Sequence, residues 1–248
     1  MRGFHFKKGG GVSLFLPAAF AGLVLPLVFG CGIPSAPYLP PVPSDTVKYP
    51  GLAEKDYLFY MPDPDTINPE VFEGFEIYYK LFDPLTVNDK FDANGDTSLS
   101  TPVSLTALQR AGYVRLASSA EISSALPTYP LLPIADADKA VSGLAINLAF
   151  SNISPATPRT TYGVNVVKTI YFNRTLKNTD GTRLLEGFTT TDDDFKVDDS
   201  DLPQGFDPAA NFDIVIALYV FSYGNDYVNL SFNIHSTGVY LGKSSLDL

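Results

Sequence analysis

Side chains that could act as nucleophiles or general bases are scarce in this sequence of 248 residues. Cys31 is the only cysteine, and His5 and His235 are the only histidines. A serine triad or a cysteine nucleophile needs a histidine base, and typical zinc sites use several histidines or cysteines. We therefore expect a protein that is not an enzyme, with no metal and no cofactor. We expect His235 to lie exposed on the polar side of a strand.

Carboxylates are the remaining groups that could do acid–base chemistry. A glycosidase needs two of them about 5 to 10 Å apart across a cleft. Glu73, Glu76 and the aspartates of residues 192–201 are the candidates for such a pair. A carbohydrate-active enzyme is therefore the alternative function, although the sequence identifies no specific pair.

Two acidic stretches could in principle hold calcium, which takes six or more oxygen ligands. The spacing of the larger one matches no known calcium loop, and runs of like charge are usually solvated, so we expect a solvated loop. The smaller one, residues 92–96, lacks the glycine and glutamate of an EF-hand, and we expect a turn there. The larger stretch contains Asp192, Asp193, Asp194, Asp198, Asp199, Asp201 and Asp207.

The thiol of Cys31 indicates a different chemistry. One cysteine cannot form an internal disulfide, and an odd cysteine in an exported protein usually pairs between chains or carries a modification. The residues before it are a basic head of Arg2, Lys7 and Lys8, followed by an almost uncharged run over residues 9–29. A basic head, an apolar run and a small residue are the layout of a secretory signal.

Val28, Gly30 and Cys31 together resemble the end of a bacterial lipoprotein signal. The resemblance implies cleavage after Gly30, attachment of a lipid to the thiol of Cys31, and acylation of the new amino terminus. The membrane would then be a partner through this anchor, in the bacterial cell envelope, with the outer membrane or the cell surface favoured. Two other interpretations are an uncleaved membrane helix, since the run is about long enough to span a bilayer, and an ordinary signal near a free thiol.

Charge and composition limit the partners of the remaining residues 31–248. They hold 14 basic and 27 acidic residues, because the three basic residues of the leader are removed. A formal charge of about −13 repels nucleic acid phosphates and anionic lipids, so we expect neither as a partner. Hydrophobic residues make up 45% of the chain, with 14 Tyr and 18 Phe, which predicts sheets with aromatic and β-branched pairs around a core.

The segment over residues 31–45 is predicted to be a tether. Prolines exclude helix and strand and favour an extended chain. At about 3.1 Å per residue, such a tether would hold the domain some 40 Å from the membrane. Residues 46–248 would form a single β-sandwich domain, elaborated over residues 83–211. The prolines of the tether are Pro34, Pro37, Pro40, Pro41 and Pro43.

Two strands are predicted at the start of the domain. Residues 56–61 alternate and end at the turn signal of residues 62–65. In residues 72–81 the pattern predicts a strand with one buried face and one face in water, the latter including Glu76, Tyr78 and Lys80.

Gly74, Phe75, Ile77 and Tyr79 resemble the third strand of a fibronectin type III domain, which is an immunoglobulin-like β-sandwich. Residues 212–218 are similar to the sixth strand of that family, and residues 236–241 to its last strand. The resemblance implies an antiparallel sandwich with a large middle insertion. The tryptophan usual on the second strand of the family is absent.

Further elements are predicted along the middle and the end of the chain. One short helix is indicated by Thr101 as N-cap, Pro102 at its first position and Gly112 as its stop. We expect a turn at residues 94–95 in the polar loop 82–100, and another at residues 224–225. Strands are expected at residues 113–117, 143–150, 163–173, 212–223, 227–234 and 238–241, with a hairpin turn at residues 180–181.

Together these patterns predict a mostly β, lipid-anchored envelope protein that is not an enzyme. Its role would be binding or structural, with a protein or a glycan as the possible ligand held by loops and exposed aromatic residues. Gly30 and Cys31 are the residues that receive a role, as the cleavage site and the site of lipid attachment.

Overall fold

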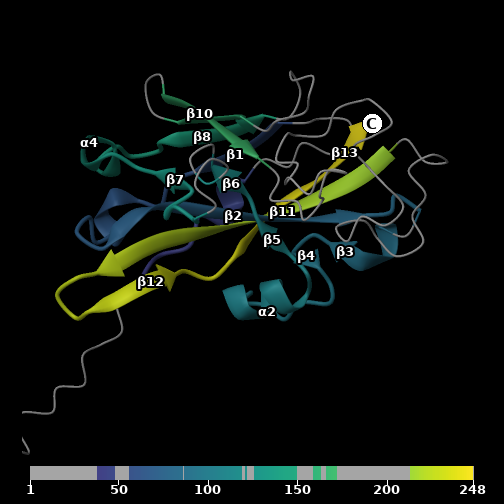
Figure 1. Cartoon of the computed structure of the whole chain (residues 1–248), viewed down its shortest axis with the longest axis horizontal. Helices are drawn as coiled ribbons and strands as arrows, with labels where there is room; N and C mark the ends of the chain where they lie inside the picture. The colour runs from purple at the N-terminus through teal and green to yellow at the C-terminus, as the bar shows by residue number, and fades with distance from the viewer. Residues whose placement is uncertain are drawn as a thin grey trace, which may run out of the picture. The chain divides into compact units, whose positions relative to one another are not determined.

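The structure is a computed structural model that describes residues 38–47, 56–85, 87–118, 121, 126–149, 159–162, 166–171 and 213–247. The chain divides into two compact units, Met1–Ala36 and Pro37–Leu248, and every described residue belongs to the second unit. This unit is mostly β with antiparallel sheets, as predicted (Figure 1).

The strands are β1 (Asp56–Tyr60), β2 (Phe72–Phe82), β3 (Phe91–Asp92), β4 (Gly95–Asp96), β5 (Val114–Arg115), β6 (Ala117–Ser118), β7 (Leu132–Pro133), β8 (Ala145–Ala149), β9 (Arg159–Tyr162), β10 (Val166–Tyr171), β11 (Asp213–Asp226), β12 (Ser231–His235) and β13 (Val239–Asp247). The helices are α2 (Leu105–Arg110) and α4 (Asp136–Lys139), and the 3-10 turns are η1 (Ser44–Thr46), η2 (Pro64–Thr66) and η3 (Asn88–Lys90). None of the helices in the described ranges is long and apolar enough to cross a membrane.

One sheet has five strands in the order β1-β8-β9-β10-β6. Strands β1 and β8 lie where residues 56–61 and 143–150 predicted them, and they pair from Asp56 with Ala149 to Tyr60 with Ala145. Strand β10 falls within the predicted residues 163–173, whereas β9 was not predicted. All strands of this sheet except β1 come from residues 83–211, so the middle segment builds most of one sheet.

The second sheet is organised around β11, the longest strand described. It pairs with β2 on one side, and with β13 and then β12 on the other. The predicted turn at residues 224–225 is wrong, because β11 continues to Asp226 and the chain turns after it. Gly224 instead allows the backbone of β11 to pass close to Val71, since a Cβ there would lie 2.1 Å from the carbonyl oxygen of Val71.

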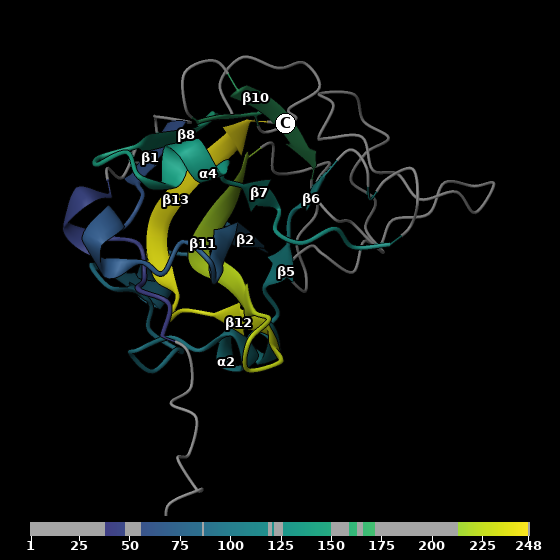
Figure 2. The same ribbon diagram turned by 90° about the vertical axis from the view of Figure 1, so that its left-hand side faces the viewer.

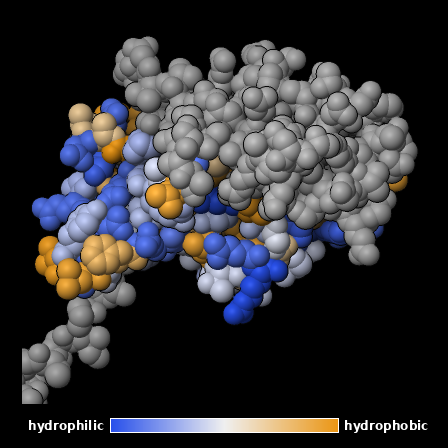
Figure 3. Space-filling view, in the orientation of Figure 1, coloured by the Kyte–Doolittle hydropathy of each residue, from blue (hydrophilic) through white to orange (hydrophobic). Residues whose placement is uncertain are grey.

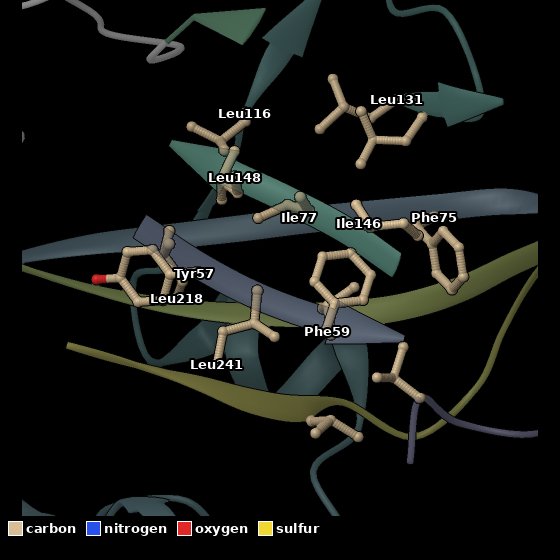
Figure 4. Close-up of a cluster of buried hydrophobic side chains, with 14 of the residues drawn as sticks. Tyr57, Phe59, Phe75, Ile77, Leu116, Leu131, Ile146, Leu148, Leu218 and Leu241 are labelled. Atoms are coloured by element: carbon tan, nitrogen blue, oxygen red, sulfur yellow. The ribbon is translucent and has the colours of Figure 1, made fainter. Parts of the chain in front are cut away.

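The main core lies between these two sheets. Strands β1 and β8 contribute Tyr57, Phe59, Ile146 and Leu148, and these meet apolar residues of β2, β11 and β13 (Figure 4). Phe59 and Phe75 come from different sheets and pack edge to face with ring centroids 5.4 Å apart. Such pairs add about 0.5–1.5 kcal/mol beyond the burial of their area.

The opposite face of the second sheet is also covered, so the prediction that β2 has one face in water is wrong. Tyr78 and Phe82 of β2 lie in a second buried cluster with Leu108 of α2 and Phe221 of β11. Figures 1 and 2 both show α2 on the side of β2 and β11 that faces away from β1 and β8. Because β2 is central and covered twice, even Glu76 is fully buried.

The predicted helix exists but begins later than expected. Ser104 is its N-cap, with a side-chain oxygen that accepts from the amide of Ala107, and the helix ends just before Gly112, near the predicted stop. Val103 is held in an isolated β-bridge with Gly238, so the helix begins only after it. A hairpin turn joins β3 to β4, but it lies at residues 93–94, one residue before the predicted 94–95, because Gly95 already pairs with Asp92 in the hairpin.

The proline-rich segment is packed where it is described. Leu39, Val42 and Val47 are buried in the main core, and the hydroxyl of Ser222 donates to the carbonyl of Pro40 at 2.7 Å. Residues 38–45 therefore belong to the domain and do not act as a spacer. The earlier part of the predicted tether lies outside the described residues.

Replacing Phe75 with alanine is predicted to lower the free energy of unfolding by about 3–5 kcal/mol, because the side chain is fully buried between the sheets. Leu85→Ala is the control: Leu85 is 80% exposed, so the loss is expected to stay within about 0.5 kcal/mol. Urea unfolding of both variants measures the difference. Equal losses would contradict the assignment of Phe75 to the core.

Candidate functional site at the end of the β11–β12 hairpin

Four large apolar side chains are exposed together where β11 turns into β12. Tyr227 is 62% exposed, Val228 84%, Leu230 74% and Phe232 54%. We call these four residues the hairpin tip. Figure 3 shows hydrophobic side chains gathered at this end of the molecule, where Figure 1 places the turn between β11 and β12. Single exposed apolar residues are common, but a contiguous group is typical of a contact surface.

The turn that carries the hairpin tip is held by Asp226. Its carboxylate accepts from the backbone amides of Val228 and Asn229 at 3.1 and 3.0 Å, and from the side-chain amide of Asn229 at 2.7 Å. Leu230 has a φ of 54°, a left-handed conformation that costs roughly 1–2 kcal/mol for a residue with a side chain. The exposure of the tip is therefore imposed by a specific turn.

The first and last residues of the tip are fixed to each other and to β2. The rings of Tyr227 and Phe232 pack edge to face with centroids 5.8 Å apart. The hydroxyl of Tyr227 donates to the carboxylate of Glu73 at 3.0 Å. These contacts order two aromatic side chains that remain largely in solvent.

His235 at the end of β12 does not have the predicted environment. Its ring packs against Tyr223 and Phe221, with centroids 5.2 and 6.3 Å away, and burial lowers its pKa below the usual value. Nδ1 lies 2.8 Å from the carbonyl of Asn233, whereas Nε2 is buried with no hydrogen-bond partner among the described residues.

The face assignment of the predicted strand 227–234 is likewise wrong. Val228, Leu230 and Phe232 point into solvent, and Ile234 alone of the four expected inward residues packs on the main core. Residues 227–230 form the turn and β12 begins only at Ser231, and Leu230 and Asn233 have φ values of 54° and 55°, so the two-residue alternation on which the prediction depended does not hold.

Beside the hairpin, Tyr129 lies between Tyr223 and Arg115. The rings of Tyr129 and Tyr223 stack at 5.6 Å and 18°, and the guanidinium carbon of Arg115 lies 4.6 Å from the centre of the Tyr129 ring. Stacking of a guanidinium on an aromatic ring adds about 0.5–2 kcal/mol. This stack joins β11 to the charged residues of β2 and β5.

Arg115 is the centre of a buried charge cluster with Glu76 and Glu121. Its Nε and Nη2 donate to the two oxygens of Glu76, and its Nη1 donates to Glu121 at 2.7 and 2.9 Å. Glu76 also accepts from the amide of Leu131 at 2.7 Å, and Glu121 accepts from the amide of Thr128 at 2.6 Å. The cluster therefore fixes the segment around residues 128–131 against β2.

The protonation of the cluster follows from these contacts. Burial acts to lower the pKa of Arg115, but its hydrogen bonds and charge interactions with Glu76 and Glu121 raise that pKa above its ordinary value, so it stays protonated. Burial raises the pKa of Glu76, while Arg115 and the Leu131 amide act in the opposite direction. Both oxygens of each carboxylate already accept hydrogen bonds, so the arrangement suits structural support more than proton transfer.

The structure describes only some of the residues that the sequence predicted to be functional. Gly30, Cys31 and the aspartates of residues 192–201 lie outside the described residues. Glu73 and Glu76 are engaged by Tyr227 and Arg115. Within the described ranges, no group of three or more His, Cys, Asp or Glu side chains could hold a metal ion.

Sequence reasoning missed the pairing of Glu76 with Arg115 and the exposed hairpin tip. A signal for the first existed, since each charge has an apolar residue on both sides, Glu76 between Phe75 and Ile77 and Arg115 between Val114 and Leu116. Charges in such positions are rarely buried unless they are paired. The exposed tip had no comparable signal, because its alternation is that of an ordinary half-buried strand.

No protein-family model, curated protein or solved structure matches this chain. The functional interpretation therefore depends on the geometry of the hairpin tip, on the charge cluster beside it and on the sequence patterns.

Replacing Arg115 with methionine is predicted to lower the free energy of unfolding by about 3–5 kcal/mol, because Glu76 and Glu121 would stay buried without their cation. Arg110→Met, on the exposed side of α2, is the control and should change stability by no more than about 0.5 kcal/mol. Denaturant unfolding at neutral pH measures both. A loss below 1 kcal/mol for Arg115→Met would contradict the supporting role of the cluster.

The lowered pKa of His235 makes part of the stability depend on pH. Between that pKa and the unfolded value of about 6.5, the unfolded chain binds more protons, so the stabilisation is present above this range and is lost as pH falls through it. His235→Phe keeps an aromatic ring against Phe221 and Tyr223 but cannot titrate. Thermal unfolding from pH 7.5 to 5 should show a shallower decline for this variant, and parallel curves would contradict the prediction.

Proposed function

We propose that this chain is a lipid-anchored protein of the bacterial envelope whose domain has a binding or structural role and is not an enzyme. The observation that carries the proposal is the hairpin tip, an ordered group of four exposed apolar residues on a hydrogen-bonded turn. Covering exposed apolar side chains removes them from water and lowers the free energy of the system. A surface of this kind therefore favours binding to a partner.

The proposed anchor is Cys31. The basic head, the apolar run and the small Gly30 before the cysteine support export, cleavage after Gly30 and lipid attachment to the thiol. Two or three acyl chains give stable anchoring, whereas a single one binds a membrane weakly and reversibly.

We also propose an immunoglobulin-like architecture of the fibronectin type III kind. In such sandwiches the third, sixth and last strands are neighbours in one sheet. The segments matched to those strands contribute to β2, β11 and β13, and β11 pairs with both of the others. The core shared between two antiparallel sheets supports the same proposal.

The carboxylate chemistry of a glycosidase has less support. A catalytic pair needs one carboxyl free to give a proton and another free to attack or to activate water. Glu76 is fully buried and bound to Arg115, and Glu73 accepts from Tyr227. Among the described candidates, both are engaged in contacts that hold the fold.

Replacing Cys31 with alanine is predicted to abolish lipid attachment. Expressing bacteria fed a clickable fatty acid should label the wild-type chain in the membrane fraction and leave Cys31→Ala unlabelled. Ser35→Ala, four residues later, is the matched control and should label like the wild type.

Two other outcomes would count against the lipid anchor. A wild-type chain that keeps its leader in the membrane fraction and carries no fatty-acid label would favour an uncleaved membrane helix. A wild-type chain whose Cys31 reacts fully with a maleimide, without fatty-acid label, would overturn the lipid anchor.

A further inference from the structure

We infer that the hairpin tip is a second membrane contact, which inserts its apolar side chains into the interfacial region of the bilayer that holds the lipid anchor. The inference rests on the proposed function, because the anchor supplies the nearby membrane. The partner that covers the tip is a lipid surface with zwitterionic headgroups.

The composition of the tip fits a lipid surface. Residues 227–232 read Tyr-Val-Asn-Leu-Ser-Phe and contain no charged residue. Tyrosine is enriched at membrane–water interfaces, because its ring is apolar and its hydroxyl is polar. Val228 and Leu230 are the two most exposed members of the tip and would reach furthest into the acyl region.

The length of the chain limits how far the anchor can lie from the base of the hairpin. Leu39 lies at the base of the hairpin, where a Cβ on Gly224 would be 3.3 Å from its Cδ1, and Pro40 accepts from Ser222 of β11. Leu39 follows Cys31 by eight positions, which span at most about 28 Å when fully extended. The lipid on Cys31 would therefore keep the membrane within this reach of the base of the hairpin.

The hairpin also extends beyond the rest of its sheet. Pairing of β11 with β2 ends at Gly224, opposite Phe72, and the turn begins after Asp226. The amide of Asn225 still donates to the carbonyl of Val71, and the turn residues 227–230 follow this last backbone contact. Figure 1 shows the β11–β12 turn projecting past β2. The apolar side chains of the tip are thus exposed at this end for a surface to meet.

The negative charge of the chain favours zwitterionic lipid over anionic lipid. A chain with a formal charge of about −13 after residue 30 is repelled by anionic headgroups, and the tip offers no lysine or arginine to attract them. The two nearest carboxylates are directed to the hairpin itself, since Glu73 accepts from Tyr227 and Asp226 from Asn229. Contact with zwitterionic lipid avoids this repulsion, and it should depend little on salt.

A protein partner is the competing occupant. Two copies of this chain would bring two negative net charges together, which disfavours self-association. Another protein could cover the same four residues, but the path from Leu39 to Cys31 makes the bilayer the nearest apolar phase. The experiment must therefore distinguish lipid contact from burial against protein.

The absence of tryptophan allows a direct measurement. The full-length chain carrying Val228→Trp would be purified from membranes and reconstituted into phosphatidylcholine vesicles, with or without bromine on the acyl chains. We expect its tryptophan emission to shift to shorter wavelength and to lose most of its intensity in the brominated vesicles. Phe232→Trp provides a second reporter within the tip and should behave in the same way.

The matched control is Leu85→Trp. Leu85 is 80% exposed and follows the end of β2 opposite to Phe72, so its tryptophan should keep its emission in both kinds of vesicle. Equal intensities with and without bromine at position 228 would overturn the inference, as would quenching that is the same at positions 228 and 85. A blue shift at position 228 without quenching would indicate a protein in contact with the tip, and would also overturn it.

The two proposals fail separately. If fatty-acid labelling shows the anchor but position 228 is not quenched, only the tip inference is lost. If the chain carries no lipid, it would be mixed with preformed vesicles and measured in the same way. Absence of quenching there would reject both proposals, and quenching would reject the anchor alone.

Discussion

The rest of the domain depends on the long antiparallel pairing of β2 with β11, which runs from Val215 opposite Phe82 to Gly224 opposite Phe72. Both strands are buried on two faces, toward β1 and β8 on one side and toward α2 on the other. Every side chain of this pair must then be apolar or have a partner, because an isolated buried charge is very unfavourable. The charge cluster is a consequence of this double burial.

Glu76 lies in the middle of β2, and its requirement for a partner organises one side of the domain. Arg115 satisfies it from β5 and also binds Glu121, so residues 128–131 are fixed nearby by their backbone amides. Tyr129 then stacks on both Arg115 and Tyr223. In this way a single buried carboxylate supports the segment next to the hairpin.

The hairpin tip is apolar and exposed, whereas the charge cluster is polar and buried. Beyond Asp226 the chain leaves the layer covered by other elements, and the four large apolar side chains of the tip face solvent on a turn closed by Asp226. The amino-terminal segment enters at the base of the same hairpin, through Leu39 and Pro40. An anchor before that segment and an apolar tip beyond it would give the domain two points of attachment and a defined orientation on a membrane.

The sequence by itself determined the mostly β, antiparallel character, the location of β1, β2, β8 and β10, and the stop of α2 near Gly112. These features depend on local alternation, turn residues and helix caps, which can be read within a few neighbouring residues. Only the tertiary structure decided that the second face of β2 is buried, that Gly224 lies within a strand, and that Val228 and Leu230 are exposed. Alternation identifies two faces of a strand, but what covers each face is set by segments far away in the sequence, such as α2 and Arg115.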